Sequence, residues 1–325
     1  MYLRKHISYL LILLLTAMLT SFSACKSTKE MGDDVENEVS STPDKLDNAL
    51  LWKVEGNGIT QPSYVYGTIH IIGKEDFFLP DGTLGAIENS DKMVFEIDMS
   101  EMTDITKQMG LLKDVFMKDN MSLKDLLTEE DYTMVKDHFQ KMGLPIFMFE
   151  RMKPMFLTVF AGEGMDINGL QTGSMKSYEM EFYEMAVQSN KGVGGLETME
   201  FQMSMFDSIP YQVQADMLIE TIKSSDEGSD QFKEMINLYK TQDINSMVSM
   251  ISEEEGGMKG FETLLVDQRN INWIPLMKNM MMDGPVFFAV GAGHLAGKNG
   301  VIQLLMKEGY TLTPLSSSTT DMKKI

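Results

Sequence analysis

Two similar stretches of sequence decide the fold: Gly67-Thr68-Ile69-His70-Ile71-Ile72-Gly73-Lys74 and Gly291-Ala292-Gly293-His294-Leu295-Ala296-Gly297-Lys298. Aligned on the histidine, both read G-x-x-H-x-x-G-K. Each follows a run of aromatic and β-branched residues, which predicts a buried strand. A histidine just beyond a strand end lies where α/β folds gather their reactive groups. We therefore expect the two ends of the chain to meet and the two histidines to share a site.

The residue types in the repeated motif suit a functional site. Gly67 and Gly291 would allow a sharp turn or a close approach to a bound group. A neutral imidazole is a common metal ligand and also an acid or base, so His70 and His294 could serve either role. A loop histidine bonded only to backbone is the simpler interpretation of one such motif. Two copies in a chain with four histidines favour function.

A third segment, residues 93–98, predicts another strand and carries two acidic residues. Glu96 and Asp98 are two positions apart, so both would point to the same face. Burying a carboxylate is costly unless it is paired or binds a metal. An edge strand whose acids face water is the alternative, and the residues alone leave both open.

The composition bounds the function. The 325 residues carry a net charge of −20, which argues against nucleic-acid binding because that requires a basic surface. The 43% hydrophobic content predicts a substantial core, and we assign the 32 methionines mainly to it. His138 lies in a polar helical segment, and we expect it at the surface.

The N-terminus reads as a targeting segment. A positive start is followed by an apolar run from Tyr9 to Leu19, too short to span a membrane comfortably, and then by Phe22-Ser23-Ala24-Cys25. Small residues before Cys25, the single cysteine, resemble a bacterial lipoprotein lipobox. We expect residues 1–24 to be a cleaved signal peptide and Cys25 to be lipidated. The protein would then be exported and anchored to the cell envelope by lipid alone.

The rest of the chain predicts one domain with mixed secondary structure. Residues 25–48 are polar and read as a flexible tether, residues 49–315 as the domain, and residues 316–325 as a polar tail. Strand patterns lie near both ends, and the middle is mainly helical. Within this pattern we expect helices over residues 174–189 and 297–307. The fold class is therefore α/β, a compact sheet built from both chain ends with a large helical insertion.

Five motifs together resemble the TraB/GumN (PrgY, Tiki) family over residues 50–314. They are Gly67-Thr68-Ile69-His70, Phe95-Glu96-Ile97-Asp98, Gly194-Gly195-Leu196-Glu197-Thr198, Arg269-Asn270 and Gly291-Ala292-Gly293-His294-Leu295-Ala296-Gly297. The resemblance implies a mixed α/β fold similar to erythromycin-esterase-like and ChaN-like proteins. Through the Tiki branch it also implies a protease dependent on a divalent metal ion.

The resemblance further implies that His70, Glu96 and His294 bind this ion, which would be Zn²⁺, Mn²⁺ or Co²⁺. Such a set leaves a position open for water, as in catalytic zinc sites. Asp98 and Glu197 are candidates for a general base, and Arg269 for stabilising an oxyanion or fixing a carboxylate. The substrate would be a peptide or protein.

Two other functions stay open. One is a regulator that captures a peptide, as the PrgY branch suggests, and the other is a protein that binds haem or a metal without catalysis, as the ChaN likeness suggests. The chain also departs from the family at Ser177-Tyr178-Glu179, where bacterial relatives often carry a Gly-Val-Asp-like segment. We therefore assign no role to this loop from the sequence.

Overall fold

The computed structural model describes residues 45–101, 105–162, 172–226, 231–253, 261 and 263–315. The expected signal peptide, the lipidation site Cys25, nearly all of the expected tether and the C-terminal tail lie outside these ranges. None of the helices within them is long and apolar enough to cross a membrane.

A six-stranded mixed sheet forms the centre of the molecule, with the order β6-β4-β7-β2-β1-β8. Its strands are β1 (Leu51–Gly56), β2 (Ser63–Thr68), β4 (Lys92–Ile97), β6 (Gly192–Glu197), β7 (Val286–Gly291) and β8 (Tyr310–Pro314). The middle strands β2, β7, β4 and β6 run parallel, whereas β1 is antiparallel to both β2 and β8. The expected strands at both chain ends are confirmed.

The two repeated motifs are brought together by direct pairing of their strands. β2 pairs with β7 in parallel, with Tyr66 opposite Ala289 and Thr68 opposite Gly291. Every residue of both strands is buried, which is typical of parallel strands covered on both faces. The prediction that the chain ends meet in one sheet is therefore confirmed.

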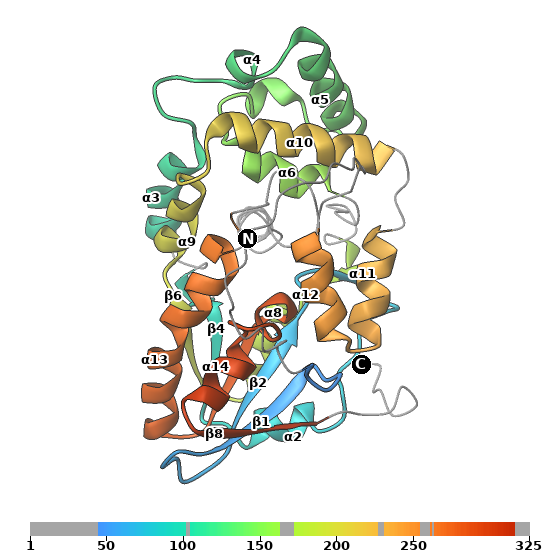
Figure 1. Ribbon diagram of the computed structural model, residues 1–325. Coiled ribbons are helices and arrows are strands. Elements are labelled where there is room, and N and C mark those ends of the chain that lie inside the picture. Colours follow the sequence, from blue (N-terminus) through green and yellow to red (C-terminus); the bar gives the residue numbers. More distant parts are fainter. Residues whose placement is uncertain are drawn as a thin grey trace, which may run out of the picture.

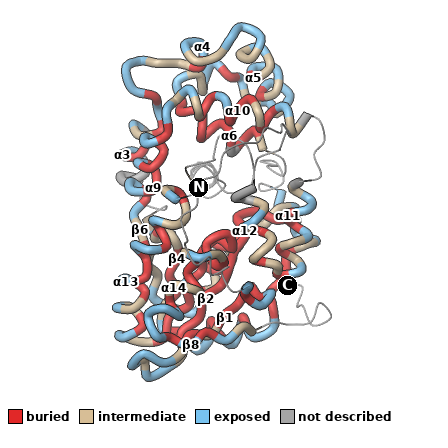
Figure 2. Tube along the Cα trace, in the orientation of Figure 1, coloured by how far each residue is buried: buried red, intermediate tan, exposed pale blue. Residues whose placement is uncertain are grey.

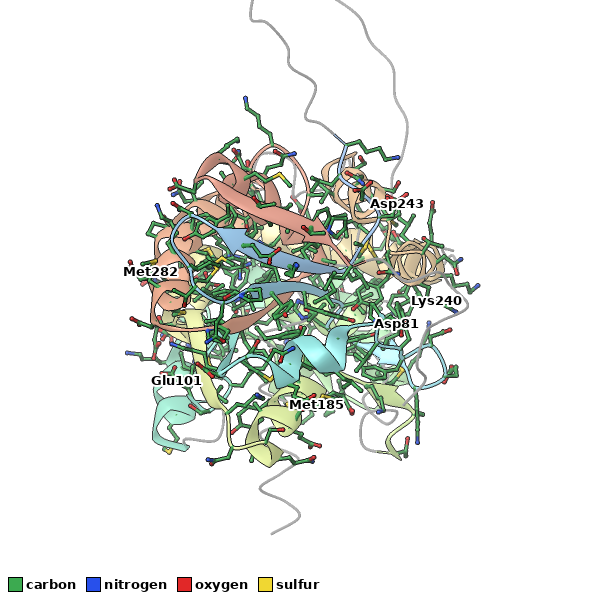
Figure 3. All side chains as sticks on the ribbon, turned by 90° about the horizontal axis from the view of Figure 1, so that it is seen from below. Asp81, Glu101, Met185, Lys240, Asp243 and Met282 are labelled. Carbon is green, nitrogen blue, oxygen red and sulfur yellow. The ribbon has the colours of Figure 1, made fainter. Side chains whose placement is uncertain are left out.

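Helices cover both faces of the sheet and extend beyond one end of it (Figure 1). The helices are α2 (Thr83–Glu88), α3 (Ile105–Val115), α4 (Leu123–Leu126), α5 (Glu129–Lys141), α6 (Pro154–Ala161), α8 (Tyr178–Gln188), α9 (Met199–Phe206), α10 (Tyr211–Asp226), α11 (Gln231–Lys240), α12 (Ile244–Glu253), α13 (Gln268–Asp283) and α14 (Val301–Lys307). The shorter turns are η2 (Ile146–Met148), η3 (Thr263–Asp267) and η4 (Ala292–His294). The sheet therefore runs between two helical layers, as the view from below shows (Figure 3).

The main hydrophobic core lies between the sheet and these helices, where buried residues concentrate (Figure 2). On one face, Tyr178 and Phe182 of α8 pack against Tyr66, with ring centroids 5.9 and 5.0 Å apart. Met199, Met203, Met277 and Met281 are also buried, so the assignment of methionine to the core is confirmed at these positions. Met148 is 62% exposed, so the structure places it outside the core.

The helical insertion makes a lobe of α4, α5, α6 and α10 beyond the sheet (Figure 1). The Lys153 side chain, 1% exposed, ion-pairs there with Asp207 at 2.5 Å, and Lys118 reaches the other Asp207 oxygen at 2.9 Å. His138 lies on α5, is half-buried and packs on Phe139, with ring centroids 5.8 Å apart. The expectation of a surface position for His138 is therefore only partly met.

Two predicted helices begin later than expected. Met175 and Lys176 form strand β5, which pairs with β3 (Ile72–Gly73). The helix α8 therefore starts at Tyr178 instead of residue 174. Similarly, α14 starts at Val301, because the backbone turns at Gly297 with a φ of +89°.

Candidate active site

The predicted site residues lie along one edge of the sheet, at the carboxyl ends of four adjacent parallel strands. Glu197 ends β6, Glu96 lies near the end of β4, His294 follows β7, and His70 follows β2. Parallel strands present their carboxyl ends at the same edge, so residues distant in sequence meet there. This edge joins residues from the first, middle and last thirds of the chain in one cluster.

Gly67 is required for the packing of one motif on the other. A Cβ atom at this position would lie 2.6 Å from Leu295 Cδ1 and 3.1 Å from Ala292 Cα. Neither Gly67 nor Gly291 has a positive φ, so left-handed backbone is not the reason for these glycines. The physical role of Gly67 is therefore close approach, here between the two motifs themselves.

The Glu96 side chain is 12% exposed and both of its oxygens are bonded, so the paired alternative for this residue is correct. The Gly291 backbone N–H donates to Oε1 at 2.8 Å, Gln202 Nε2 donates to Oε2 at 3.2 Å, and Arg269 Nη2 forms an ion pair with Oε2. Burial would raise the pKa of Glu96, but the positive charge of Arg269 and these bonds lower the pKa far below its ordinary value. The Glu96 carboxylate is therefore a stable anion at the centre of the cluster.

Arg269 lies in the first turn of the helix α13 and bridges two carboxylates. Its Nη2 donates to Glu197 Oε1 at 2.6 Å, in addition to Glu96, and its Nε donates to the same Glu197 oxygen at 3.0 Å. Trp273 Nε1 donates to the second Glu197 oxygen at 3.0 Å. Burial raises the pKa of Glu197 by more than Arg269 lowers it. The sequence prediction that Arg269 fixes a carboxylate through its fork therefore agrees with this geometry.

His294 is completely buried, and its protonation state follows from its partners. Arg269 Nη1 lies 3.1 Å from Nε2, and because a guanidinium only donates, Nε2 carries no proton. Nδ1 then donates to Asn270 Oδ1 at 2.7 Å. The Asn270 Nδ2 faces the backbone carbonyls of Asn299 and His294, which fixes the orientation of the amide. Burial, and after it the charge of Arg269, lower the pKa of His294 to about 3, so the ring is neutral.

His70 lies against a carboxylate that we did not predict, Glu179. Its Nδ1 donates to Glu179 Oε1 at 2.9 Å, and Thr68 Oγ1 donates to the same oxygen at 2.7 Å. Ser177 Oγ donates to the other oxygen at 3.0 Å. Burial lowers the pKa of His70, but the charge of Glu179 raises it by more, to a value above the ordinary one.

Glu179 reaches His70 because of the small β3–β5 sheet. β3 begins two residues after His70, and its partner β5 ends three residues before Glu179, so their pairing places the start of α8 beside the first motif. The segment Ser177-Tyr178-Glu179, where the chain departs from the family pattern, thus contains a residue of the site, Glu179. A carboxylate in the corresponding family segment was the one signal in the sequence that could have identified it.

Asp98 is the one predicted site residue whose carboxylate bonds outside the cluster. It follows the end of β4 and accepts hydrogen bonds from Ser100 N at 2.9 Å and Ser100 Oγ at 2.6 Å. Its carboxylate therefore supports the local turn. The other five predicted residues interact with one another: the charge of His70 acts on both Glu96 and His294, and Glu96 Oε1 lies 3.9 Å from His294 Nε2.

The donor types fit a divalent cation. Both histidines have Nδ1 held by a hydrogen-bond acceptor, the usual second interaction of a metal-ligating imidazole, which leaves Nε2 as the ligand atom. As arranged, however, the described residues contain no group of three His, Cys, Asp or Glu side chains that could hold a metal ion. The guanidinium of Arg269 lies between Glu96 and His294 and takes up their free bonding positions.

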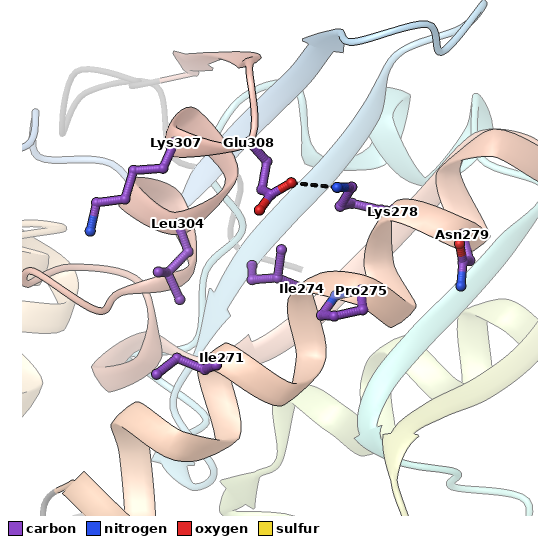
Figure 4. A pocket seen from close by; sticks show the side chains of 8 residues that line it. All are labelled: Ile271, Ile274, Pro275, Lys278, Asn279, Leu304, Lys307 and Glu308. Carbon is purple, nitrogen blue, oxygen red and sulfur yellow. Dashed lines mark hydrogen bonds and ion pairs between the residues drawn. The ribbon is translucent and has the colours of Figure 1, made fainter.

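A separate surface groove lies on α13, between this helix and α14 (Figure 4). It has a volume of about 450 Å³, and none of the predicted site residues lines it. Ile271, Ile274 and Leu304 form its apolar part, and the ion pair between Lys278 and Glu308 lies at its edge. The groove is therefore distinct from the histidine cluster.

The fold and the cluster define a mixed α/β protein with a two-histidine, acid-rich site at the carboxyl edge of its sheet. Residues 50–314 match the TraB/PrgY/gumN family, and the chain belongs to this family. No solved structure gives a significant match, so the likeness to erythromycin-esterase and ChaN-like folds stays a prediction.

Among characterised proteins, the chain is similar to several named metalloproteases. It is 23% identical to "Metalloprotease TIKI1" of Danio rerio, over 83% of this chain and 64% of the relative. It is 22% identical to "Metalloprotease TIKI1" of Homo sapiens, over 81% and 61%, and 22% identical to "Metalloprotease TIKI homolog" of Nematostella vectensis, over 92% and 74%. The chain thus spans about six-tenths of the length of the two vertebrate relatives.

Proposed function

We propose that this protein is a metal-dependent hydrolase, most similar in activity to a peptidase, with His70, Glu96 and His294 as its metal ligands. One observation carries the proposal: the sheet edge gathers two imidazoles, each with Nδ1 held by a hydrogen-bond acceptor, and the carboxylate of Glu96. The names of the relatives support the reaction class. The metal would be Zn²⁺, Mn²⁺ or Co²⁺, all of which accept nitrogen and oxygen ligands.

Each residue of the cluster would have a defined task. A divalent ion would lower the pKa of a bound water and polarise a substrate carbonyl. Asn270 and Glu179 would hold the two imidazoles in orientation, whereas the donors of Arg269 are directed at Glu96, Glu197, His294 and the Leu265 carbonyl. Of the two predicted bases, Glu197 lies in the cluster, and Asp98 is bonded to Ser100 instead. Glu197 is therefore the better candidate for a base.

Removal of metal tests this function directly. We expect purified protein to hydrolyse a peptide library, to lose this activity after chelation, and to regain it when Zn²⁺, Mn²⁺ or Co²⁺ is added back. Metal analysis by mass spectrometry should give about one ion per chain before chelation. A chelated protein that hydrolyses peptides as fast as the untreated one would contradict the proposal.

A non-catalytic peptide-binding protein is the second candidate, and one observation favours it. Arg269 already satisfies Glu96 and His294, so the cluster is electrostatically complete without a metal. In this case the same peptides would bind without cleavage, and their binding would survive chelation. Calorimetric titration of the chelated protein with these peptides separates the two functions.

Replacing Glu179 with glutamine should weaken metal binding by about 10- to 100-fold, the usual effect of removing a partner of a ligating histidine. The charge that raises the pKa of His70 and fixes its ring would be lost, so we also expect a lower pKa for His70 in an NMR titration of the metal-free protein. Glu181→Gln is the matched control, because Glu181 is on the same helix and pairs with Lys176. Equal effects of the two substitutions would show that Glu179 has no special role.

We also propose that the protein is a lipid-anchored protein of the cell envelope, exposed outside the cytoplasm. The basis is the sequence before Cys25, because these residues lie outside the described ranges. Replacing Cys25 with alanine should move the protein from the membrane fraction to the soluble fraction. An unchanged distribution would rule out anchoring through this residue.

A further inference from the structure

The guanidinium of Arg269 lies where the proposed metal ligands converge. Its Nη1 faces His294 Nε2 at 3.1 Å, and its Nη2 pairs with Glu96 Oε2. His294 and Glu96 are two of the three proposed metal ligands. The atoms that Arg269 contacts, His294 Nε2 and Glu96 Oε2, are the ones that would bind the ion. The side chain is nearly completely buried, and Leu265 O accepts a further hydrogen bond from Nη1 at 3.2 Å.

Arg269 and a metal ion cannot both hold these positions. A guanidinium and a dication repel each other, and the repulsion is strong in a buried environment because solvent screening is weak there. His294 Nε2 has one lone pair, so it can accept from Arg269 or bind a metal, and not both. Metal binding therefore requires the guanidinium to leave His294 and Glu96.

Glu197 is a second anion that can hold the Arg269 guanidinium after it leaves His294 and Glu96. Glu197 accepts from both Nε and Nη2 of Arg269, at 3.0 and 2.6 Å. Its other oxygen accepts from Trp273 Nε1, which fixes the carboxylate, and the Trp273 ring lies 4.9 Å from the guanidinium carbon. Glu197 and Trp273 therefore offer Arg269 a charge partner and a flat surface that do not depend on Glu96.

We propose that Arg269 is an internal competitor that sets the cation affinity of this site, and that Glu197 is the anion that retains its guanidinium when a metal binds. The proposal rests on the proposed function, because it assumes that His294 and Glu96 are metal ligands. Arg269 substitutes for the ion in the metal-free protein and neutralises the buried carboxylates. A metal ion must displace Arg269 to bind. Arg269 therefore weakens metal binding, and Glu197 strengthens it.

The test is the affinity for Co²⁺ in four forms of the full-length protein: wild type, Arg269→Gln, Glu197→Gln and the double variant. Calorimetry gives the affinity, and visible absorption reports coordination by nitrogen and oxygen ligands, so neither readout depends on activity. We expect Arg269→Gln to bind Co²⁺ about 10- to 100-fold more tightly, because a charge-assisted hydrogen bond contributes about 1.5–3 kcal/mol. Glu197→Gln should bind more weakly, because Arg269 then has no other anion.

The double variant separates this role from direct ligation by Glu197. If Glu197 acts only through Arg269, its replacement should have no effect once Arg269 is absent, and the double variant should bind like Arg269→Gln. If Glu197 were itself a ligand, the double variant would bind more weakly than Arg269→Gln, and the proposal would be wrong. Lys278→Gln and Glu200→Gln are the matched controls for the loss of a charge on α13 and α9.

The outcomes also distinguish this proposal from the proposed function. If wild type binds Co²⁺ but His294→Ala does not, and the Arg269 and Glu197 variants bind like wild type, the competition is disproved while the metal site stands. If the wild type, Arg269→Gln and His294→Ala bind Co²⁺ equally, the ion is bound elsewhere and both proposals fail. Should Arg269→Gln not fold, weaker binding by Glu197→Gln with an unchanged Co²⁺ spectrum at saturation supports the competition. A changed spectrum, which would show that a ligand was lost, or equal or tighter binding disproves it.

Discussion

Replacing His294 or His70 with alanine should remove the bound metal and reduce peptide hydrolysis to background. His294 is completely buried, with its unprotonated Nε2 facing Arg269 Nη1 and 3.9 Å from Glu96 Oε1, and the Nε2 of His70 is left available by the bond from Nδ1 to Glu179. Losing one of three protein ligands leaves a site that cannot compete with water for the ion. We expect the metal content to fall from about one ion per chain to a small fraction in both variants.

His138→Ala is the matched control for this experiment. His138 lies on α5 in the helical lobe, away from the sheet edge, so its replacement should leave metal content and hydrolysis unchanged (Figure 1). Because His294 fills space in the core, circular dichroism should first confirm that each variant is folded. Equal metal content in the wild type and in both folded variants would show that the two histidines are not ligands.

Replacing Arg269 with glutamine should lower the free energy of unfolding by about 3–5 kcal/mol in metal-free buffer, the usual effect of removing one member of a buried ion pair. The side chains of its partners Glu96 and Glu197 are 12% and 5% exposed, so water cannot replace the guanidinium. Urea denaturation followed by circular dichroism measures the change. Lys278→Gln removes a charge from the same helix, but its pair with Glu308 is exposed to solvent, so it should leave the free energy of unfolding nearly unchanged.

This loss should depend on pH in a known direction. In the wild type the pKa of Glu96 lies below its ordinary value of 4.5, so its contribution to stability is present above that pH and is lost as the pH falls. Without Arg269, burial dominates and raises the pKa, so the variant is destabilised further as the pH rises. Both effects make the difference between the two proteins large at neutral pH and smaller below about pH 4.5. A difference that is constant from pH 4 to pH 8 would show that Glu96 is not buried as an anion.

Much of the fold was predictable because its signals are local. The segments before Gly67 and Gly291 are rich in aromatic and β-branched residues, which identifies both as buried strands. The similarity of the two motifs that follow predicted that the two strands lie close together. The predicted helix starts at residues 174 and 297 were wrong, because strand β5 precedes the first helix and a turn at Gly297 precedes the second. The two-residue strand β5 exists only because β3 lies beside it, and no periodicity reveals so short an element.

The candidate site was predictable in part for the same reason. His70 and His294 lie just after a strand, Glu197 ends one and Glu96 is the last residue but one of another, which a sequence shows. Asp98 follows the same pattern, yet its carboxylate turns to Ser100, because β4 ends one residue earlier. Glu179 and Asn270 were not assigned roles, because each acts by contact with a histidine that is distant in sequence, 109 and 24 residues away.

The sequence by itself determined that this protein has strands at both ends of its domain, an insertion of helices between them, and two histidines after paired strands. Only the tertiary structure decided which side chains bond to which at the sheet edge. In that structure the Arg269 guanidinium bonds to Glu96, Glu197 and His294, and the Glu179 carboxylate bonds to His70. The physical reason is that strand and helix patterns arise from neighbouring residues, whereas the pairing of buried charges depends on which strands lie side by side.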